Sequence, residues 1–319
     1  MPSLKARLIL THECNGKCWY CYINKTKKFM EKEMIDLIIK KLSDIFNTKI
    51  FTRFNITLTG GDPYLSPYFI YAVEKILETF KNPSIRADTS IWAPKDLVDK
   101  YTNLRGISLV SLNEDPVDEV IKMAKLFKKK KRLVYINILL TPFNISRLDE
   151  VITKGMENEL PLRLNHLYSP KDCESFRDEL FNTIIETGQR LLRENYKYYD
   201  YFFSMLAIDR KRETFCGYGK NFLVFDTDGS VSRCQAELDQ PVGNVKDDNL
   251  LDLIKTDSEL LPYPKRCSGC NDLESCWGGC VYANKFGGYC KEYKASLAIM
   301  KELKLRRNKD VKIAAVSGL

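Results

Sequence analysis

The sequence has no long hydrophobic run, and the short apolar stretch near its N-terminus is not followed by a small-residue cleavage site. A helix that crosses a bilayer needs about 20 apolar residues in succession, and a secretory signal peptide needs the cleavage site. The sequence therefore excludes a membrane span and a secreted protein, and we expect a cytoplasmic location. In the cytosol thiols stay reduced, and clustered cysteines are metal ligands more often than disulfides.

The sequence also lacks a strong excess of one charge. Its 50 basic and 42 acidic residues give a net charge of +8, and the one strong basic run is Lys128–Arg132. We interpret that run as a solvated helix end. No basic face with interleaved aromatic residues is present, so we expect no nucleic-acid partner. Internal repeats and low-complexity segments are absent too, and the length of 319 residues allows about two domains.

Against these absences stand eleven cysteines, an odd number that fits full disulfide pairing poorly. Thiolates are soft ligands that favour iron–sulfur clusters or zinc. Three of them form a C-x3-C-x2-C run, which is one ligand short of closing a cubane cluster, so its open iron indicates catalysis. The run consists of Cys14, Cys18 and Cys21. A second group near the C-terminus consists of Cys216, Cys234, Cys267, Cys270, Cys276, Cys280 and Cys290.

Residues 1–205 alternate short apolar runs with amphipathic stretches, which predicts repeated βα units and a parallel sheet. The expected strands are Ala6–Thr11, Phe54–Thr59, Ser84–Asp88, Gly106–Leu112, Leu133–Leu140 and Leu162–Leu167. The expected helices are Met30–Phe46, Pro67–Phe80, Lys95–Tyr101, Pro116–Phe127, Ser146–Glu157 and Cys173–Tyr196. Six units are too few for a full eight-stranded barrel. The pattern therefore predicts an α/β fold with a partial (β/α)6 TIM-like barrel.

Two motifs follow the first two expected strands. The cysteine run comes after the first strand, and Thr59-Gly60-Gly61-Asp62-Pro63 comes after the second. In βα architectures the active site lies at the carboxyl ends of the strands. Glycines there let the backbone approach a ligand closely, although a tight βα turn is the plainer interpretation of the second motif.

Residues 206–293 are rich in cysteine, glycine and turn dipeptides, and we expect them to form a separate domain that metal ligation stabilises. Within it, Phe222–Phe225 and Ser230–Arg233 are predicted to form a hairpin. Residues 294–319 are predicted to form a helix over Lys294–Arg307, followed by a strand or a tail over Val311–Val316.

The N-terminal cysteine run, preceded by a strand, resembles the radical S-adenosylmethionine (radical SAM) superfamily. The resemblance implies that Cys14, Cys18 and Cys21 hold a catalytic 4Fe–4S cluster whose open iron binds S-adenosylmethionine. Reduction would then yield a 5′-deoxyadenosyl radical that abstracts a hydrogen atom. The second motif matches the family's Gly-Gly-Glu-Pro loop, with Asp62 in place of Glu. The resemblance suggests cofactor contacts from Tyr20, Thr59, Gly60, Gly61, Asp62, Ser111 and Asn137.

The C-terminal cysteines resemble the SPASM extension of the same superfamily, with seven matched positions. The resemblance implies two auxiliary 4Fe–4S clusters, and so three clusters in all. Structural zinc sites are the alternative. One cluster would be held by Cys267, Cys270, Cys276 and Cys290. The other would be held by Cys216, Cys234 and Cys280, with a fourth site that is open or filled by Cys173.

Most members of that subfamily modify peptides, so the resemblance implies hydrogen abstraction from a peptide substrate that leads to its modification or crosslinking. Two alternatives stay open: a small-molecule dehydrogenase or epimerase, and a non-enzymatic iron–sulfur electron carrier. We expect a low-potential electron donor such as flavodoxin or ferredoxin. Because the chain begins almost at its first strand, we also expect either a separate protein that binds a leader peptide or a substrate bound without one.

Three further expectations concern single residues. The resemblance argues against a formylglycine-forming enzyme, because those enzymes carry Asp where this chain has Gln235. The two histidines, His12 and His166, are expected to be hydrogen-bonded structural residues near the pocket. The substrate, the bond formed and the oligomeric state are not encoded in any pattern that we can identify.

Overall fold

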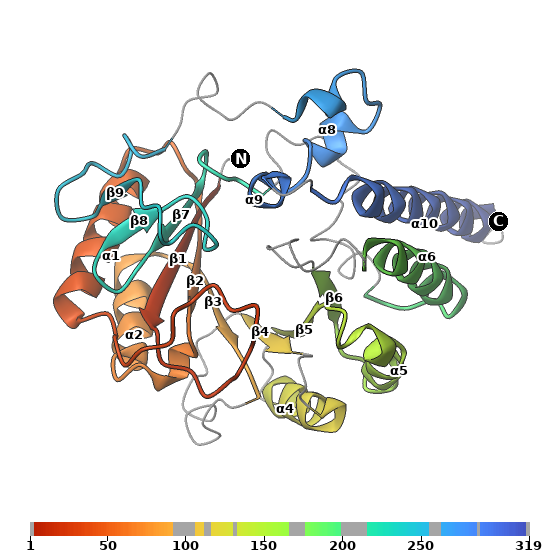
Figure 1. Cartoon of the computed structure of the whole chain (residues 1–319), viewed down its shortest axis with the longest axis horizontal. Coiled ribbons are helices and arrows are strands. Elements are labelled where there is room, and N and C mark those ends of the chain that lie inside the picture. The colour runs from red at the N-terminus through yellow and green to blue at the C-terminus, as the bar shows by residue number, and fades with distance from the viewer. Residues whose placement is uncertain are drawn as a thin grey trace. The chain divides into compact units, whose positions relative to one another are not determined.

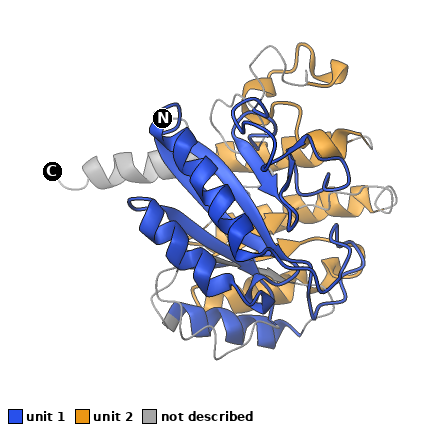
Figure 2. Cartoon of the chain, turned by 90° about the vertical axis from the view of Figure 1, so that its left-hand side faces the viewer, with its two compact units in different colours: residues 1–111, 115–136, 216–262 blue, residues 112–114, 137–215, 263–319 orange. Residues whose placement is uncertain are grey.

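The computed structural model describes residues 3–91, 106–111, 116–129, 133–165, 176–198, 216–254, 263–285 and 288–316. The chain divides into two compact units, coloured separately in Figure 2. The first comprises residues 1–111, 115–136 and 216–262, and the second comprises residues 112–114, 137–215 and 263–319. Within the described residues, no helix is both long and apolar enough to span a membrane.

A mostly parallel sheet forms the centre of the first unit (Figure 1). Its strands are hydrogen-bonded in the order β5-β4-β3-β2-β1-β7-β8-β9. The pairs β1–β2, β2–β3, β3–β4 and β1–β7 are parallel, whereas β7–β8 and β8–β9 are antiparallel. The strands are β1 (Ser3–Thr11), β2 (Arg53–Gly60), β3 (Ser84–Thr89), β4 (Gly106–Ser111), β5 (Leu133–Leu139), β7 (Phe222–Phe225), β8 (Ser230–Ser232) and β9 (Gly243–Asn244).

Three helices of the first unit return the chain between parallel strands: α1 (Lys32–Asn47), α2 (Phe69–Thr79) and α4 (Val117–Lys129). In α1 the buried residues recur at helical spacing, so one apolar stripe is buried, as is usual for a helix that covers a sheet. Alternate residues of β1 supply the matching apolar face; they are Leu4, Ala6, Leu8 and Leu10, all fully buried. The other face of β1 carries Lys5 and Arg7, which places polar side chains on the opposite side of the sheet.

The second unit contains the end of β5, the strand β6 (Leu162–Asn165) and mostly helices. Its longer helices are α5 (Leu148–Glu157), α6 (Arg177–Arg193) and α10 (Cys290–Val316). Helices α6 and α10 lie side by side, and the absence of a side chain at Gly188 brings Ile299 of α10 close to the backbone of α6. The hydroxyl of Tyr196 donates to the carbonyl of Leu160 (2.6 Å) and accepts from the amide of Leu162 (2.8 Å), which fastens the end of α6 beside β6.

The predicted βα order is confirmed, with boundaries that shift by a few residues. Every expected strand is present, and the hairpin over β7 and β8 forms as predicted. One prediction is wrong: Val311–Val316 is neither strand nor tail but the last part of α10. No glycine or proline interrupts the chain between Cys290 and Val316, so nothing ends the helix earlier. The expected helix Lys95–Tyr101 lies outside the described residues, and the division at residues 205 and 293 stays a prediction.

Candidate active site

The three N-terminal cysteines lie on one loop that leaves the end of β1 and returns to it. The amide of His12 donates to the carbonyl of Lys28 (2.9 Å), and the amide of Met30 donates to the carbonyl of Leu10 (2.9 Å), so the two ends of the loop are joined. The pairing of β1 with β2 slips between Ile9 and Thr11, at the point where the chain turns into the loop. Such a bulge redirects a strand and is common beside active sites.

Inside this loop the thiols lie near one another. The amide of Gly16 donates to the sulfur of Cys14 (3.3 Å), and the amide of Cys21 donates to the carbonyl of Cys18 (3.2 Å). A Cβ added at Gly16 would lie 3.5 Å from the sulfur of Cys14 and 3.6 Å from that of Cys18, so both sulfurs border one glycine. Burial raises the pKa of the Cys14 and Cys21 thiols, and the Gly16 amide and the Lys25 ammonium oppose that rise at Cys14.

The Gly-Gly-Asp motif joins the cysteine loop through backbone hydrogen bonds. The amide of Gly61 donates to the carbonyl of Thr11 (2.7 Å), and the amide of Asp62 donates to the carbonyl of Glu13 (2.8 Å). Gly60 has a φ of +139°, and a Cβ there would lie 2.2 Å from the Thr11 oxygen; at Gly61 it would lie 2.0 Å from the Glu13 oxygen. Only glycine allows this approach. The two sequence motifs therefore form one structural unit at the carboxyl ends of β1 and β2.

The carboxylate of Asp62 fastens this unit to the next strand. It is 1% exposed and accepts hydrogen bonds from the hydroxyl of Thr89 (2.9 Å) and from the amide (3.3 Å) and hydroxyl (3.1 Å) of Ser90. It also accepts a hydrogen bond from the amide of Tyr64 (3.2 Å), which lies in the turn that follows the motif. Burial raises the pKa of Asp62, and the hydrogen bond from Thr89 acts against that rise. Asp62 thus joins the ends of β2 and β3.

The other residues expected to bind the cofactor are more dispersed. Tyr20 is half-buried in the cysteine loop, and Thr59 is buried on β2. Ser111 is the last residue of β4, which places it at the carboxyl end of its strand. Asn137 lies on β5 in the part assigned to the second unit, and its Oδ1 is buried without a hydrogen-bond partner in the described residues.

A histidine–carboxylate pair joins the cysteine loop to the hairpin. Nε2 of His12 lies 2.6 Å from Oδ1 of Asp226 at the end of β7, and both side chains are largely buried. Burial alone would raise the pKa of Asp226, but the hydrogen bonds from His12 and from the amide of Thr227 lower it below its ordinary value. The structural role expected for His12 agrees with this pair, whereas His166 lies outside the described residues. Sequence reasoning missed Asp226, because it lies between the two strands of the predicted hairpin and its partner His12 is distant in the sequence.

A second group missed from the sequence lies on the polar face of the sheet. Arg7 on β1 donates to Asp88 on β3 (3.1 Å) and to Oε1 of Gln235. Nε of Arg86 lies 3.0 Å from the other oxygen of Asp88, and Nη1 of Arg86 donates to the hydroxyl of Tyr135 (2.6 Å). The carboxylate of Asp88 therefore lies between the guanidinium groups of Arg7 and Arg86. Together these three side chains carry one net positive charge. The sequence shows these charged residues at alternate positions of the expected strands. It does not show which of them form pairs, because the partners are distant in the sequence.

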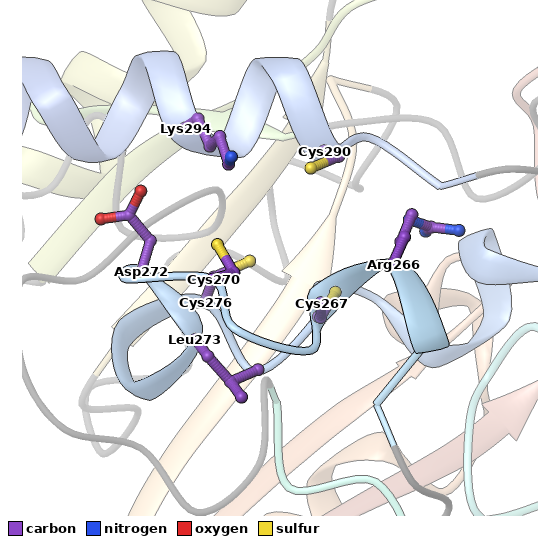
Figure 3. A pocket seen from close by; sticks show the side chains of 9 residues that line it. Arg266, Cys267, Cys270, Asp272, Leu273, Cys276, Cys290 and Lys294 are labelled. Atoms are coloured by element: carbon purple, nitrogen blue, oxygen red, sulfur yellow. The ribbon is translucent and has the colours of Figure 1, made fainter.

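Four of the C-terminal cysteines line one pocket in the second unit. Cys267, Cys270, Cys276 and Cys290 line a small pocket that is partly open to solvent, together with Arg266 and Lys294. Figure 3 shows the thiols turned toward this cavity, with Lys294 of α10 directed into it. Cys267 lies in a 3-10 turn (Lys265–Cys267), Cys276 ends the short helix α8 (Leu273–Cys276), and Cys290 begins α10. Burial raises the pKa of the Cys267 thiol, and the charge of Arg266 acts against that rise.

The other predicted cluster is distributed over both units. Cys216 and Cys234 belong to the first unit and Cys280 to the second, so this ligand set stays a prediction. The sulfur of Cys234 accepts from the amide of Ala236 (3.5 Å), and that of Cys280 accepts from the amide of Ala283 (3.5 Å), at the start of α9 (Val281–Asn284). Cys173, the alternative fourth ligand, lies outside the described residues.

The donor sets fit iron–sulfur clusters by their chemistry. Ten cysteines are free thiols in the described residues. No three Cys, His, Asp or Glu side chains in that part of the chain are already arranged as ligands of a single metal ion. The fit therefore rests on soft sulfur donors grouped on one loop and around one pocket.

The comparison with known families agrees with this geometry. The radical SAM superfamily model matches residues 8–154, which include both the cysteine loop and the Gly-Gly-Asp motif. Residues 8–154 therefore form a radical SAM domain. The fold class of the chain is confirmed as well: it is an α/β fold with a mostly parallel sheet.

Among curated relatives, the chain is similar to "Mycofactocin maturase MftC" of Mycobacterium tuberculosis. The two are 23% identical over 321 residues, which cover 88% of this chain and 78% of that protein. It is also similar to a "Probable GTP 3',8-cyclase" of Sulfurisphaera tokodaii, with 24% identity over 80% of this chain and 86% of that one.

Two solved structures have the same fold. One is anSMEcpe with bound AdoMet and Cp18Cys peptide, with a TM-score of 0.70, 20% identity, and coverage of 96% of this chain and 99% of that one. The other is Streptococcus suis SuiB bound to its precursor peptide SuiA, with a TM-score of 0.67, 16% identity, and coverage of 91% and 74%.

Proposed function

We propose that this enzyme modifies a peptide by radical chemistry that begins with removal of a hydrogen atom. The observation that carries the proposal is the pair of backbone hydrogen bonds from Gly61 and Asp62 to the cysteine loop. They join a glycine-rich strand end to the loop that carries the three thiols, and this supports a site for a cluster-bound cofactor. Cys14, Cys18 and Cys21 would hold a 4Fe–4S cluster together with S-adenosylmethionine.

When bound, the cluster and S-adenosylmethionine supply one-electron chemistry strong enough to remove a hydrogen atom from carbon. The chain's own residues hold and orient these groups. Gly60 and Gly61 bring the backbone of β2 close to the loop, and Asp62 holds that backbone to the end of β3. The His12–Asp226 pair fastens the base of the same loop to the hairpin. Tyr20, Thr59, Ser111 and Asn137 stay proposed contacts of the cofactor.

The auxiliary sites belong to the same proposal. Cys267, Cys270, Cys276 and Cys290 would hold one auxiliary 4Fe–4S cluster, because all four line a single cavity. Cys216, Cys234 and Cys280 would hold the other. The oxidation of a substrate by hydrogen removal releases a second electron, and an auxiliary cluster is a suitable acceptor for it.

A peptide is the substrate that the relatives favour. One curated relative is named a maturase, and the two solved structures contain bound peptides. We therefore propose a peptide substrate, presented directly or by a separate leader-binding protein, and a low-potential electron donor. A cytoplasmic location suits the unpaired thiols. A small-molecule substrate is the second candidate, because one relative of similar identity is named a GTP cyclase.

The first experiment is anaerobic reconstitution with iron and sulfide, followed by S-adenosylmethionine and dithionite. We expect release of 5′-deoxyadenosine. Replacement of Cys14, Cys18 and Cys21 together by Ala should abolish this release, while iron at the C-terminal cysteines persists. The matched control replaces Cys267, Cys270 and Cys276 by Ala, which should reduce the iron content but leave cofactor cleavage intact. Cofactor cleavage by the N-terminal triple variant would contradict the assignment.

The second experiment identifies the substrate class. A short peptide encoded beside this gene would be incubated with the reconstituted enzyme, and its mass would be measured. Loss of two hydrogen atoms from the peptide indicates a crosslink or an oxidation. Cofactor cleavage that GTP or another small molecule stimulates, with every adjacent peptide unchanged, would favour the second candidate.

A further inference from the structure

The segment that carries the catalytic thiols is positively charged along its whole length. Between Cys14 and Met30 there are four lysines and no acidic residue. Lys17, Lys27 and Lys28 are exposed, whereas Lys25 is partly buried and its ammonium donates to the carbonyl of Gly16. The whole chain has 50 basic and 42 acidic residues, so a stretch with lysines alone departs from its average composition.

The same loop carries an exposed aromatic ring. Trp19 is 47% exposed, although it follows Cys18 directly, and its ring meets that of Tyr20 edge-on at 5.5 Å. Large aromatic side chains on a surface are typical of protein-binding sites, where they supply contact area at little entropic cost. We call Lys17, Trp19, Lys27 and Lys28 the lysine surface.

The acidic residues nearest in the sequence are Glu13 and Glu31, which flank this segment. Glu13 precedes the first cysteine, and its backbone carbonyl accepts from Asp62. Glu31 follows Met30 and lies against Tyr68, whose pKa it raises. The ends of the loop are held at β1 by the carbonyl of Lys28, which accepts from His12 and from the hydroxyl of Thr11 (2.9 Å). The lysines are therefore presented on a fastened loop beside the thiols.

A cluster on this loop must receive its electron from outside the protein. Electron transfer slows steeply with distance, so a protein donor has to dock close to the cysteines. Positive charge at that place attracts a partner of opposite charge and raises the rate of productive encounter. The same attraction weakens as salt screens it.

We propose that the lysine surface is the docking site of an acidic one-electron carrier protein, with carboxylates around its redox group. In the complex one electron leaves the reduced carrier and one enters the cluster at Cys14, Cys18 and Cys21. The carrier is oxidised by one electron, and no atom is transferred. Trp19 supplies an apolar contact, and the lysines pair with carboxylates of the carrier. The inference rests on the proposed function, because it needs a cluster at these cysteines.

The test compares two reductants on the reconstituted holoenzyme. Reduced flavodoxin is the acidic carrier, and dithionite is a small reductant that needs no docking surface. Lys17, Lys27 and Lys28 are replaced together by Glu, and 5′-deoxyadenosine release is measured against flavodoxin concentration at low and high salt. We expect the flavodoxin-driven rate at low salt to fall at least about tenfold, while the dithionite-driven rate is unchanged. The salt dependence of the flavodoxin-driven rate should disappear.

The matched control reverses three exposed lysines on α4, namely Lys122, Lys125 and Lys128, which changes the net charge equally. This variant should keep the flavodoxin-driven rate. An unchanged flavodoxin-driven rate in the Lys17, Lys27 and Lys28 variant would overturn the proposal, as would an equal loss in the α4 variant.

Two other outcomes are distinguishable. If the Glu variant also loses the dithionite-driven rate, a second variant with Lys→Arg at the same three positions is measured. This variant keeps the charges, so we expect it to keep the flavodoxin-driven rate. A loss of that rate in the Lys→Arg variant would overturn the proposal. If the variant keeps both rates but loses peptide modification, the lysine surface binds the peptide substrate instead of the donor, which also overturns it. No cofactor cleavage by the unaltered enzyme with dithionite would refute the proposed function itself.

Discussion

Asp62 shows how much one side chain can hold in place. In the family motif this position is Glu, but here the shorter carboxylate is buried and accepts from Tyr64, Thr89 and Ser90. Those donors come from the turn after β2 and from the end of β3. Removal of a buried acceptor leaves its donors unsatisfied, which costs more than the hydrogen bonds themselves contribute.

We therefore expect Asp62→Ala to lower the free energy of unfolding by about 2–3 kcal/mol. Asp62→Asn should lower it less, because the amide keeps one acceptor oxygen. The measurement is urea denaturation followed by circular dichroism. The control is Asp44→Ala at an exposed position of α1, which should have little effect. Equal stability of Asp62→Ala and the unaltered chain would show that the carboxylate does not hold the strand ends together.

At the scale of elements, the contact of α6 with α10 determines where one of the proposed cluster ligands lies. Cys290 is the first residue of α10, so any shift of this helix moves its thiol relative to the other three around the pocket. The contact is close because Gly188 has no side chain: an added Cβ would lie 2.5 Å from Cδ1 of Ile299.

A leucine at position 188 should therefore separate the two helices. We expect Gly188→Leu to destabilise the fold by about 1–3 kcal/mol through overpacking and to lower iron occupancy of the C-terminal pocket. Iron would be counted in the variant that lacks Cys14, Cys18 and Cys21, so that the loop does not contribute. Gln189→Leu, on the exposed side of the same helix, is the control and should keep its iron. Full iron occupancy in Gly188→Leu would show that the position of α10 does not limit cluster binding.

At the scale of the whole molecule, the described parts differ in how they are stabilised. The sheet of the first unit has a deep apolar core, in which alternate residues of β1 are fully buried. Residues 263–285 have few buried side chains, and two of these are the cysteines Cys267 and Cys280. We therefore expect this segment to depend on the proposed cluster for its stability, as small metal-bound modules depend on their metal.

Removal of iron should therefore affect the two parts unequally. After chelation under reducing conditions, we expect amide hydrogen exchange to increase strongly over residues 263–285 and to change little in β1, β2 and β3. The strands serve as the internal control of the same experiment. Equal protection of residues 263–285 with and without iron would mean that protein packing alone stabilises this segment.

The sequence by itself determined the parts whose evidence is local. The cysteine spacings predict the type of ligand, and the alternation of apolar runs predicts the βα order, because both patterns lie within a few neighbouring residues. Contacts between distant positions followed only from the tertiary structure. His12 contacts Asp226, which lies 214 residues later in the sequence, and Arg7 contacts Gln235, which lies 228 residues later. Both contacts form because β7 pairs with β1 in the sheet. Asp62 finds Thr89 and Ser90 because β2 and β3 pair in parallel and end together. Such partners depend on which strands become neighbours, and that order follows from the burial of the whole sheet and from no local pattern.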